Sequence, residues 1–160
     1  MNTLPETETK TRDKHILVAV DQSESSKRAV LYVADFVGGF PGFTVTLLSI
    51  INEPGEDFFE TDDDRKIWIS NATEKSVNLL DKYRQILIQS GFPEEKVKTS
   101  VCVDAPGSLT ELILSFQCNL NCCTVVVGRH HKSKTEEFLF GSTSSRIIHD
   151  AKNCAIWVVE

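Results

Sequence analysis

Residues 124–145 combine a strand-like apolar run with small hydroxyl side chains in an order that suits anion binding. The run Thr124 to Val127 is β-branched and apolar, which is typical of a buried strand, and Gly128 ends it. After a polar loop, a helix start is favoured by Gly141-Ser142-Thr143-Ser144-Ser145, because hydroxyl groups satisfy the free N–H groups of a first turn. The positive end of such a helix attracts phosphate. We therefore predict that this stretch forms an anion-binding cradle.

The same stretch resembles the nucleotide-binding segment of the universal stress protein family. The family pattern is Gly, two residues, Gly, nine residues, and then Gly followed by Ser or Thr. In this chain Gly128 and Gly141-Ser142 occupy the outer positions at the family spacing, whereas His131 replaces the middle glycine. The resemblance extends over nearly all of the chain after residue 14, including the apolar run before Asp21 and the ending Ile156 to Val159.

The resemblance implies an ATP site, with Mg²⁺ accompanying the bound triphosphate. In the family's ATP-binding members, the residues that match Asp21 and Ile50 surround the adenine, and the Gly-Ser run holds the phosphates. The nucleotide-binding residues expected on this basis are Val20, Asp21, Ile50, Gly128, Arg129, His131, Gly141, Ser142, Thr143 and Ser144.

Departures from the family pattern predict weakened binding. If residue 131 needs a positive φ, a histidine there costs about 1–2 kcal/mol, and its ring fills space that a phosphate would use. Alternatively the loop relaxes, and Arg129, His130, His131 and Lys132 supply cationic donors. Asp104 stands where many members have glycine and adds negative charge near the expected ligand. The proline expected before the last strand is missing at Asn153-Cys154-Ala155.

The order of apolar runs and helical patterns predicts an α/β fold. Continuous apolar runs indicate strands at 15–20, 43–51, 96–103, 123–127 and 154–159, and helices are expected to about 38 after a cap at 21–26, and at 67–90, 106–119 and 142–152. This alternation implies right-handed βαβ units and a single open parallel five-stranded sheet with helices on both faces. The resemblance adds the strand order 3-2-1-4-5, which brings Asp21 beside Gly128.

Length and charge limit the classes of function. A chain of 160 residues fits one domain, here a family domain at 14–160 after a flexible tail at 1–13. The net charge of −6 argues against a nucleic-acid partner. No apolar run of membrane-spanning length occurs, and the N-terminus lacks a signal core, so we expect no membrane partner and a cytoplasmic location. The five cysteines are expected to be reduced thiols.

Several residues have a structural explanation beside a functional one. Asp21 could cap the first helix, and Gly128 could be required for a positive φ. The run Asp62-Asp63-Asp64, at the end of an acidic loop at 53–64, fits a solvated helix start better than a Ca²⁺ site. Phe58 and Phe59 could cover a ligand or a partner, or simply pack within a surface loop, and the sequence leaves these alternatives open.

Three hypotheses for the function follow. The first is a regulatory module of the stress response that binds ATP, and the second is a dimeric family member that has lost the nucleotide and acts only through protein partners. The third is a slow ATPase; no enzyme activity beyond that is expected, because nucleophile-elbow, dinucleotide and P-loop motifs are absent. The apolar strand at 154–159, an edge in the family order, predicts a homodimer with Trp157 near the contact.

Overall fold

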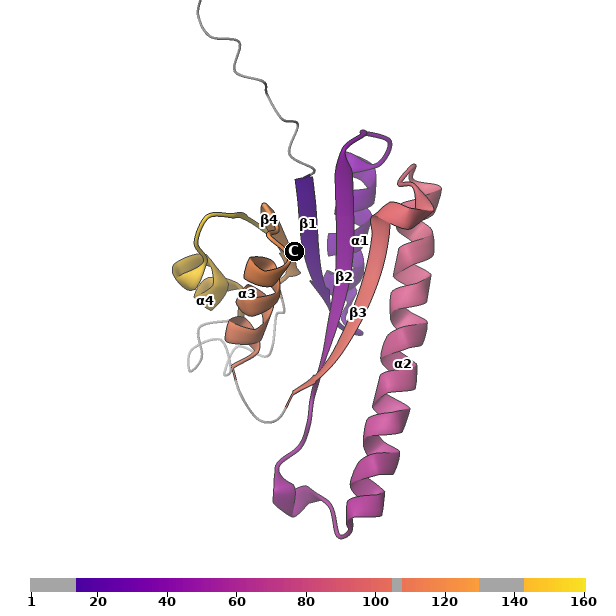
Figure 1. Ribbon diagram of the computed structural model, residues 1–160, viewed down its shortest axis with the longest axis vertical. Coiled ribbons are helices and arrows are strands. Elements are labelled where there is room, and N and C mark those ends of the chain that lie inside the picture. Colours follow the sequence, from indigo (N-terminus) through magenta and orange to yellow (C-terminus); the bar gives the residue numbers. More distant parts are fainter. Residues whose placement is uncertain (1–13, 105–107, 130–142) are drawn as a thin grey trace, which may run out of the picture.

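The computed structural model describes residues 14–104, 108–129 and 143–160 (Figure 1). The predicted tail at 1–13, the residues Pro106 and Gly107, and the loop at 130–142 lie outside these ranges. The strands are β1 (Lys14–Val20), β2 (Phe43–Asn52), β3 (Val97–Asp104), β4 (Thr124–Gly128) and β5 (Ala155–Val159). The α-helices are α1 (Glu24–Val37), α2 (Asp62–Gln89), α3 (Leu109–Asn119) and α4 (Thr143–Asp150). Two short 3₁₀ turns, η1 (Glu56–Phe58) and η2 (Glu94–Lys96), precede α2 and β3.

All five strands form one parallel sheet in the order β3-β2-β1-β4-β5, which confirms the predicted fold and strand order. The central strand β1 pairs with β2 on one side and with β4 on the other, so that Ala19 lies opposite Leu48 and Val127. The carboxyl ends of β1 and β4 therefore meet, as expected from this strand order.

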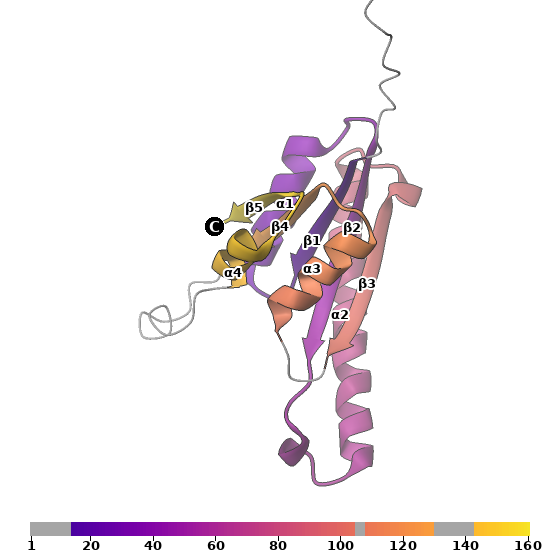
Figure 2. The same cartoon turned by 60° about the vertical axis from the view of Figure 1, so that its left-hand side comes forward.

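Helices cover the sheet on both faces because the strands are apolar on both faces. Alternate residues of β1 divide between two cores: Ile16, Val18 and Val20 pack with α1 and α2, whereas Leu17 packs with α3 and α4. Figure 2 shows α3 and α4 in front of the sheet and α1 and α2 behind it. This two-sided burial is what the continuous apolar runs predict for parallel strands.

Capping residues explain where the first two helices begin, and they correct two predictions. The side chain of Ser23, not of Asp21, caps α1 by accepting a hydrogen bond from the Ser26 N–H. Helix α2 begins at Asp62 rather than at Ile67, because Thr61 caps it through the Asp64 N–H. Three aspartates, Asp62 to Asp64, then occupy its first turn, where the helix dipole favours negative charge. This position agrees with their interpretation as a helix start.

Helix α2 is longer than the sheet that it covers. Its 28 residues correspond to about 42 Å at 1.5 Å per residue. Figures 1 and 2 both show its N-terminal part projecting beyond the carboxyl ends of the strands, together with the loop that follows β2. We call residues 53–71 the arm. No helix within the described ranges is long and apolar enough to cross a membrane.

Asn153, two residues before β5, adopts a conformation that proline cannot take. Asn153 has a φ of 57°, in the left-handed region that asparagine tolerates better than most residues. Proline is held near −65°, so it would not fit this turn. A proline would therefore not fit at Asn153, the first of the three residues at which the sequence lacks one.

Candidate functional site

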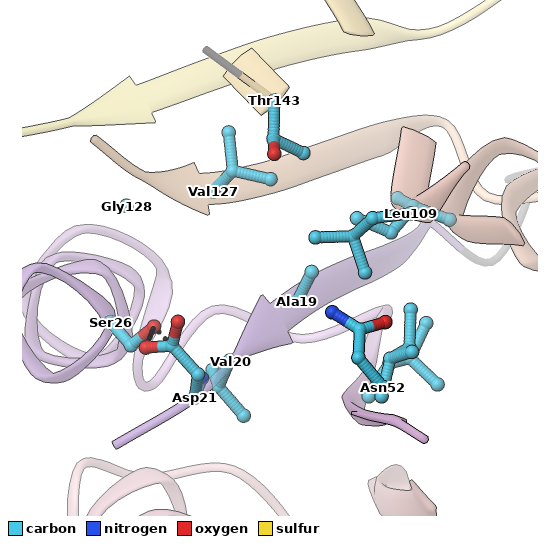
Figure 3. Close-up of a pocket in the computed structure, with 12 residues that line it drawn as sticks. Ala19, Val20, Asp21, Ser26, Asn52, Leu109, Val127, Gly128 and Thr143 are labelled. Carbon is cyan, nitrogen blue, oxygen red and sulfur yellow. Dashed lines mark hydrogen bonds between the residues drawn. The ribbon is translucent and has the colours of Figure 1, made fainter. Parts of the chain in front are cut away.

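A cavity of about 190 Å³ opens at the carboxyl edge of the sheet, where β1, β2 and β4 end (Figure 3). It is lined by Ala19, Val20, Asp21, Ser26, Leu48, Ile50, Asn52, Leu109, Ile113, Val127, Gly128 and Thr143. This volume is below the range of about 300–1,000 Å³ usual for drug-sized ligands. The described part of the cavity therefore suits a ring-sized group, and a larger ligand would extend past its mouth.

Asp21 is held at the cavity by a small hydrogen-bond network. Its Oδ1 accepts hydrogen bonds from the Ser23 N–H at 2.8 Å and from the Ser26 hydroxyl at 2.9 Å. The Ser26 oxygen in turn accepts from the Asp21 N–H at 3.0 Å. Figure 3 shows the Asp21 and Ser26 side chains directed toward each other. The carboxylate is therefore oriented by the start of α1 instead of capping it.

Gly128 is required for a close approach of backbones and not for a positive φ. A Cβ atom at this position would lie 2.5 Å from the carbonyl carbon of Ser25 and 2.8 Å from the Ser26 nitrogen. Real Cβ contacts of this length essentially never occur. The hypothesis of a positive φ is wrong, because Gly128 is not among the glycines with positive φ. The start of α1 thus packs directly on the end of β4.

The start of α4 contributes one hydroxyl residue to the cavity. Thr143 is the first residue of α4 and lines the cavity beside Val127. Ser144 is buried at 5% exposure and is not part of the cavity lining. The cradle residues Gly141 and Ser142, and the substituted His131, lie outside the described residues.

Arg129 follows β4 but turns toward the end of the chain. Its N–H donates to the Val159 carbonyl at 2.7 Å, and its guanidinium donates to a Glu160 carboxylate oxygen at 3.1 Å. It is exposed and is not part of the cavity lining. Of the sequence-predicted site residues, the structure brings together Val20, Asp21, Ile50, Gly128 and Thr143.

Several lining residues escape prediction from the sequence. Asn52 extends β2 one residue beyond the predicted strand, and its side-chain amide points back over the end of β1 (Figure 3). Its backbone pairs with Asp104 of β3. Asp104, which stands where many family members have glycine, therefore lies next to a residue that lines the cavity. Leu109 and Ile113 come from α3, whose position over the sheet is a tertiary property. A signal for Asn52 was available, since polar residues at the carboxyl ends of parallel strands gather at one edge.

The charge of the cavity limits how an anion could lie in it. Among the lining residues in the described ranges, Asp21 alone carries a charge. A phosphate would therefore be repelled from the β1 end and would lie toward Gly128 and Thr143, whereas the Asp21 carboxylate suits an N–H or O–H donor.

The cysteines are free thiols and take no part in this site. Cys122 is buried, and burial raises the pKa of its thiol to about 11. Burial also raises the pKa of Cys154. In the described part of the chain, no three His, Cys, Asp or Glu side chains are grouped so that they could bind a metal ion.

Solved structures share this fold over almost the whole chain. The structure of the hypothetical protein MJ0577 is 26% identical, with a TM-score of 0.73 over 92% of this chain and 96% of that chain. A universal stress protein from Archaeoglobus fulgidus in complex with dAMP is 21% identical, with a TM-score of 0.60 over 92% of this chain and 98% of that chain. A universal stress protein in complex with cAMP is 17% identical, with a TM-score of 0.66 over 92% of this chain and 97% of that chain.

No curated protein matches this chain at a significant level. The family model of the universal stress protein family matches residues 13–160, which include every described strand and helix. The chain therefore belongs to the universal stress protein family.

Proposed function

We propose that this protein is a regulatory module that binds an adenine nucleotide, with ATP as the ligand, in the cytoplasm. The observation that carries the proposal is the cavity between the ends of β1 and β4, lined by Val20, Asp21, Ile50 and Gly128. Ligands of open α/β sheets bind at such a point. The structural neighbours solved with dAMP and cAMP support an adenine nucleotide as the ligand class.

The lining residues divide into a base side and a phosphate side. Apolar contacts from Ile50 and Leu109 would hold the adenine ring, and Asp21 would accept a hydrogen bond from a base or ribose donor. Phosphates would lie toward Gly128 and the Thr143 hydroxyl, away from the Asp21 carboxylate. The expected phosphate contacts of Gly141 and Ser142 remain part of the proposal, and Mg²⁺ would accompany a bound triphosphate.

The affinity for ATP is proposed to be reduced by His131. A glycine at this position would allow the backbone to approach the phosphates, as in the family pattern. The described cavity is also small, which limits the contact area available to the ligand.

A homodimer through β5 forms part of the proposal. Among the described residues β5 pairs with β4 alone, and Val158 is 37% exposed. Beside this edge, the Trp157 ring packs edge-on against Tyr32 and Phe36 at 5.9 and 5.8 Å. Phe36 is 59% exposed, so an apolar surface continues from the open strand edge onto α1. A second copy related by a two-fold axis would cover both features.

Calorimetry with ATP tests the nucleotide proposal, using Ala19→Leu to fill the cavity. The unmodified protein should bind ATP, Ala19→Leu should weaken binding about tenfold or more because its side chain occupies ligand space, and His131→Gly should strengthen it. Ala72→Leu on α2 is the matched control and should leave binding unchanged. AMP and GTP, measured in parallel, define the ligand class.

Each competing hypothesis has its own outcome in the same experiment. Undetectable ATP binding by both the unmodified protein and His131→Gly would overturn the nucleotide proposal and favour a dimer that acts only through protein partners. Steady phosphate release from ATP would favour the slow ATPase instead. Unchanged binding in Ala19→Leu would place the nucleotide outside this cavity.

A further inference from the structure

The arm carries apolar side chains that belong to neither core. Phe58 is 66% exposed and Ile67 is 60% exposed. Among the described residues, the members that α2 contributes to the cores begin only at Leu79. We call Phe58, Phe59, Ile67 and Trp68 the arm patch. It lies beyond the sheet edge, on the part of the chain that projects in Figures 1 and 2.

The aromatic rings of the arm patch pack on one another. Phe58 and Phe59 meet edge-on with centroids 5.1 Å apart, and Phe59 meets Trp68 at 5.9 Å. These contacts link the loop after β2 to the first turns of α2. The Phe59 and Trp68 side chains are half-buried, whereas Phe58 and Ile67, which directly precedes Trp68 on α2, remain exposed.

An ion pair joins the two ends of the segment between β2 and α2. The Arg65 guanidinium donates to both carboxylate oxygens of Glu53, with Nη2 3.1 Å from Oε2. This hydrogen-bonded pair holds the pKa of Glu53 below its usual range. Because Glu53 directly follows β2, the pair connects α2 to the sheet. The arm patch is therefore held in place by this link, so that less conformational entropy is lost when a partner binds.

The charge around the patch is strongly negative. Residues 53–66 contain seven carboxylates and only two cationic side chains, Arg65 and Lys66. Arg65 is engaged with Glu53, and Lys66 lies 3.9 Å from Asp63 with both groups exposed. Asp57 and Glu60 pair with no cation in the described part of the chain. A partner that carries positive charge would therefore be attracted to this end of the molecule.

The internal structure of the arm accounts for some of these residues and not for others. Helix α2 is stabilised by aspartates in its first turn and by the Thr61 cap. Neither Asp57 nor Glu60 belongs to that turn, and the exposure of Phe58 and Ile67 contributes nothing to folding. Large exposed apolar side chains that are surrounded by charge are typical of an interaction surface.

We propose that the arm patch is the docking surface for a basic amphipathic segment of a partner protein. Phe58 and Ile67 act as apolar anchors, and Asp57, Glu60 and the first turn of α2 attract lysine and arginine side chains around them. Nucleic acids and anionic membranes are repelled by the same carboxylates. This surface is distinct from the cavity, so the inference does not depend on nucleotide binding.

The chain offers a single-residue reporter for this surface. Its two tryptophans are Trp68 in the arm and Trp157 on β5, so Trp157→Phe leaves Trp68 as the only indole. In that background, a synthetic helical peptide of leucine and lysine is titrated while Trp68 fluorescence is recorded. A leucine–glutamate peptide and a serine–lysine peptide of the same length separate the contributions of charge and apolar contact.

Paired variants test the anchors and the charges. Phe58→Ser together with Ile67→Ser should weaken binding of the leucine–lysine peptide about tenfold or more. Phe40→Ser is the matched control, because Phe40 is 63% exposed in the turn between α1 and β2, at the other end of β2 from the arm, and it should change binding less than about twofold. Asp57→Asn together with Glu60→Gln should weaken binding about fivefold at 50 mM salt and less at 200 mM. Circular dichroism checks that each variant is folded.

The proposal requires saturable binding of the leucine–lysine peptide that depends on both anchors and charges. It is overturned if that peptide gives no saturable signal by Trp68 fluorescence or by calorimetry. It is also overturned if the leucine–glutamate or serine–lysine peptide binds equally well, or if the anchor variant binds as the unmodified arm does. Self-association of the protein that is lost in the anchor variant would assign the patch to a second copy instead, and binding to anionic phosphatidylserine vesicles would assign it to a membrane.

Discussion

Gly128 at the end of β4 lies against the backbone of Ser25 at the start of α1, so that no Cβ atom fits between them. The glycine at the first position of the family pattern therefore has a packing role in this chain, whatever ligand the cavity holds. The same contact positions the first turn of α1, and with it the Ser26 hydroxyl that orients Asp21.

We predict that Gly128→Ala destabilises the protein. The added methyl group would overlap with the Ser25 carbonyl, and overpacking of this kind costs about 1–3 kcal/mol. Gly55→Ala is the control, because Gly55 has a φ of −56° and a Cβ there meets nothing within 4 Å. The free energy of unfolding from urea denaturation is the measurement. Equal stability of the two variants would show that α1 can move away from β4 at little cost.

The hydroxyl of Ser26 should contribute to stability through Asp21. Ser26 is buried at 4% exposure, and Ser26→Ala removes both the donor to the carboxylate and the acceptor for the Asp21 N–H. The loss is expected to be about 1–3 kcal/mol. Ser70→Ala on the exposed surface of α2 should have almost no effect. If Asp21 contacts the nucleotide as proposed, Ser26→Ala also weakens ATP binding, and unchanged affinity would argue against that contact.

His15 should make stability depend on pH. Its Nε2 lies 2.7 Å from the Thr46 hydroxyl oxygen. Burial lowers the pKa of His15 in the folded protein, with a further contribution from Lys98, while a backbone contact with Leu120 opposes the shift. The unfolded chain therefore binds a proton at a higher pH than the folded chain does. Stability that is fully present above about pH 6.5 should decrease as the pH falls toward the folded pKa.

His15→Gln isolates this contribution because glutamine can still bond Thr46 but does not titrate. Urea midpoints measured between pH 8 and pH 5.5 should fall more steeply for the unmodified protein than for the variant. Parallel curves would mean that His15 has the same pKa in both states.

The sequence predicts the sheet well because its strands are buried on both faces. Each of the five apolar runs appears as a strand with ends shifted by one residue, as for β2, which ends at Asn52 instead of Ile51. The start of α2 is missed for a physical reason. Its apolar spacing begins at Ile67, but capping by Thr61 and the aspartates lengthens it outside the core, where no apolar pattern is required.

The candidate site is predicted in part, for a different reason. Residues at or near the carboxyl ends of strands, such as Asp21 and Ile50, can be placed at the sheet edge once the strand order is known. Leu109 and Ile113 cannot, because the sequence does not determine how α3 lies across the sheet. The role of Gly128 is also a tertiary property, since it depends on the distance between β4 and α1.

The last prediction is a homodimer formed through β5, the edge strand of the sheet. A charged residue placed on this strand should disrupt the dimer. Val158 is 37% exposed and belongs to neither core, so Val158→Lys should leave the monomer folded while placing a buried charge in a β5–β5 contact. Phe36→Ser should weaken the dimer more mildly by removing part of the apolar surface beside Trp157. Val77→Lys is the matched control, because Val77 on α2 is 43% exposed and does not belong to β5.

Light scattering at micromolar concentration should give a dimer mass for the unmodified protein and for Val77→Lys, and a monomer mass for Val158→Lys. A monomer mass for the unmodified protein would refute the prediction, and a dimer that survives Val158→Lys would move the contact away from β5.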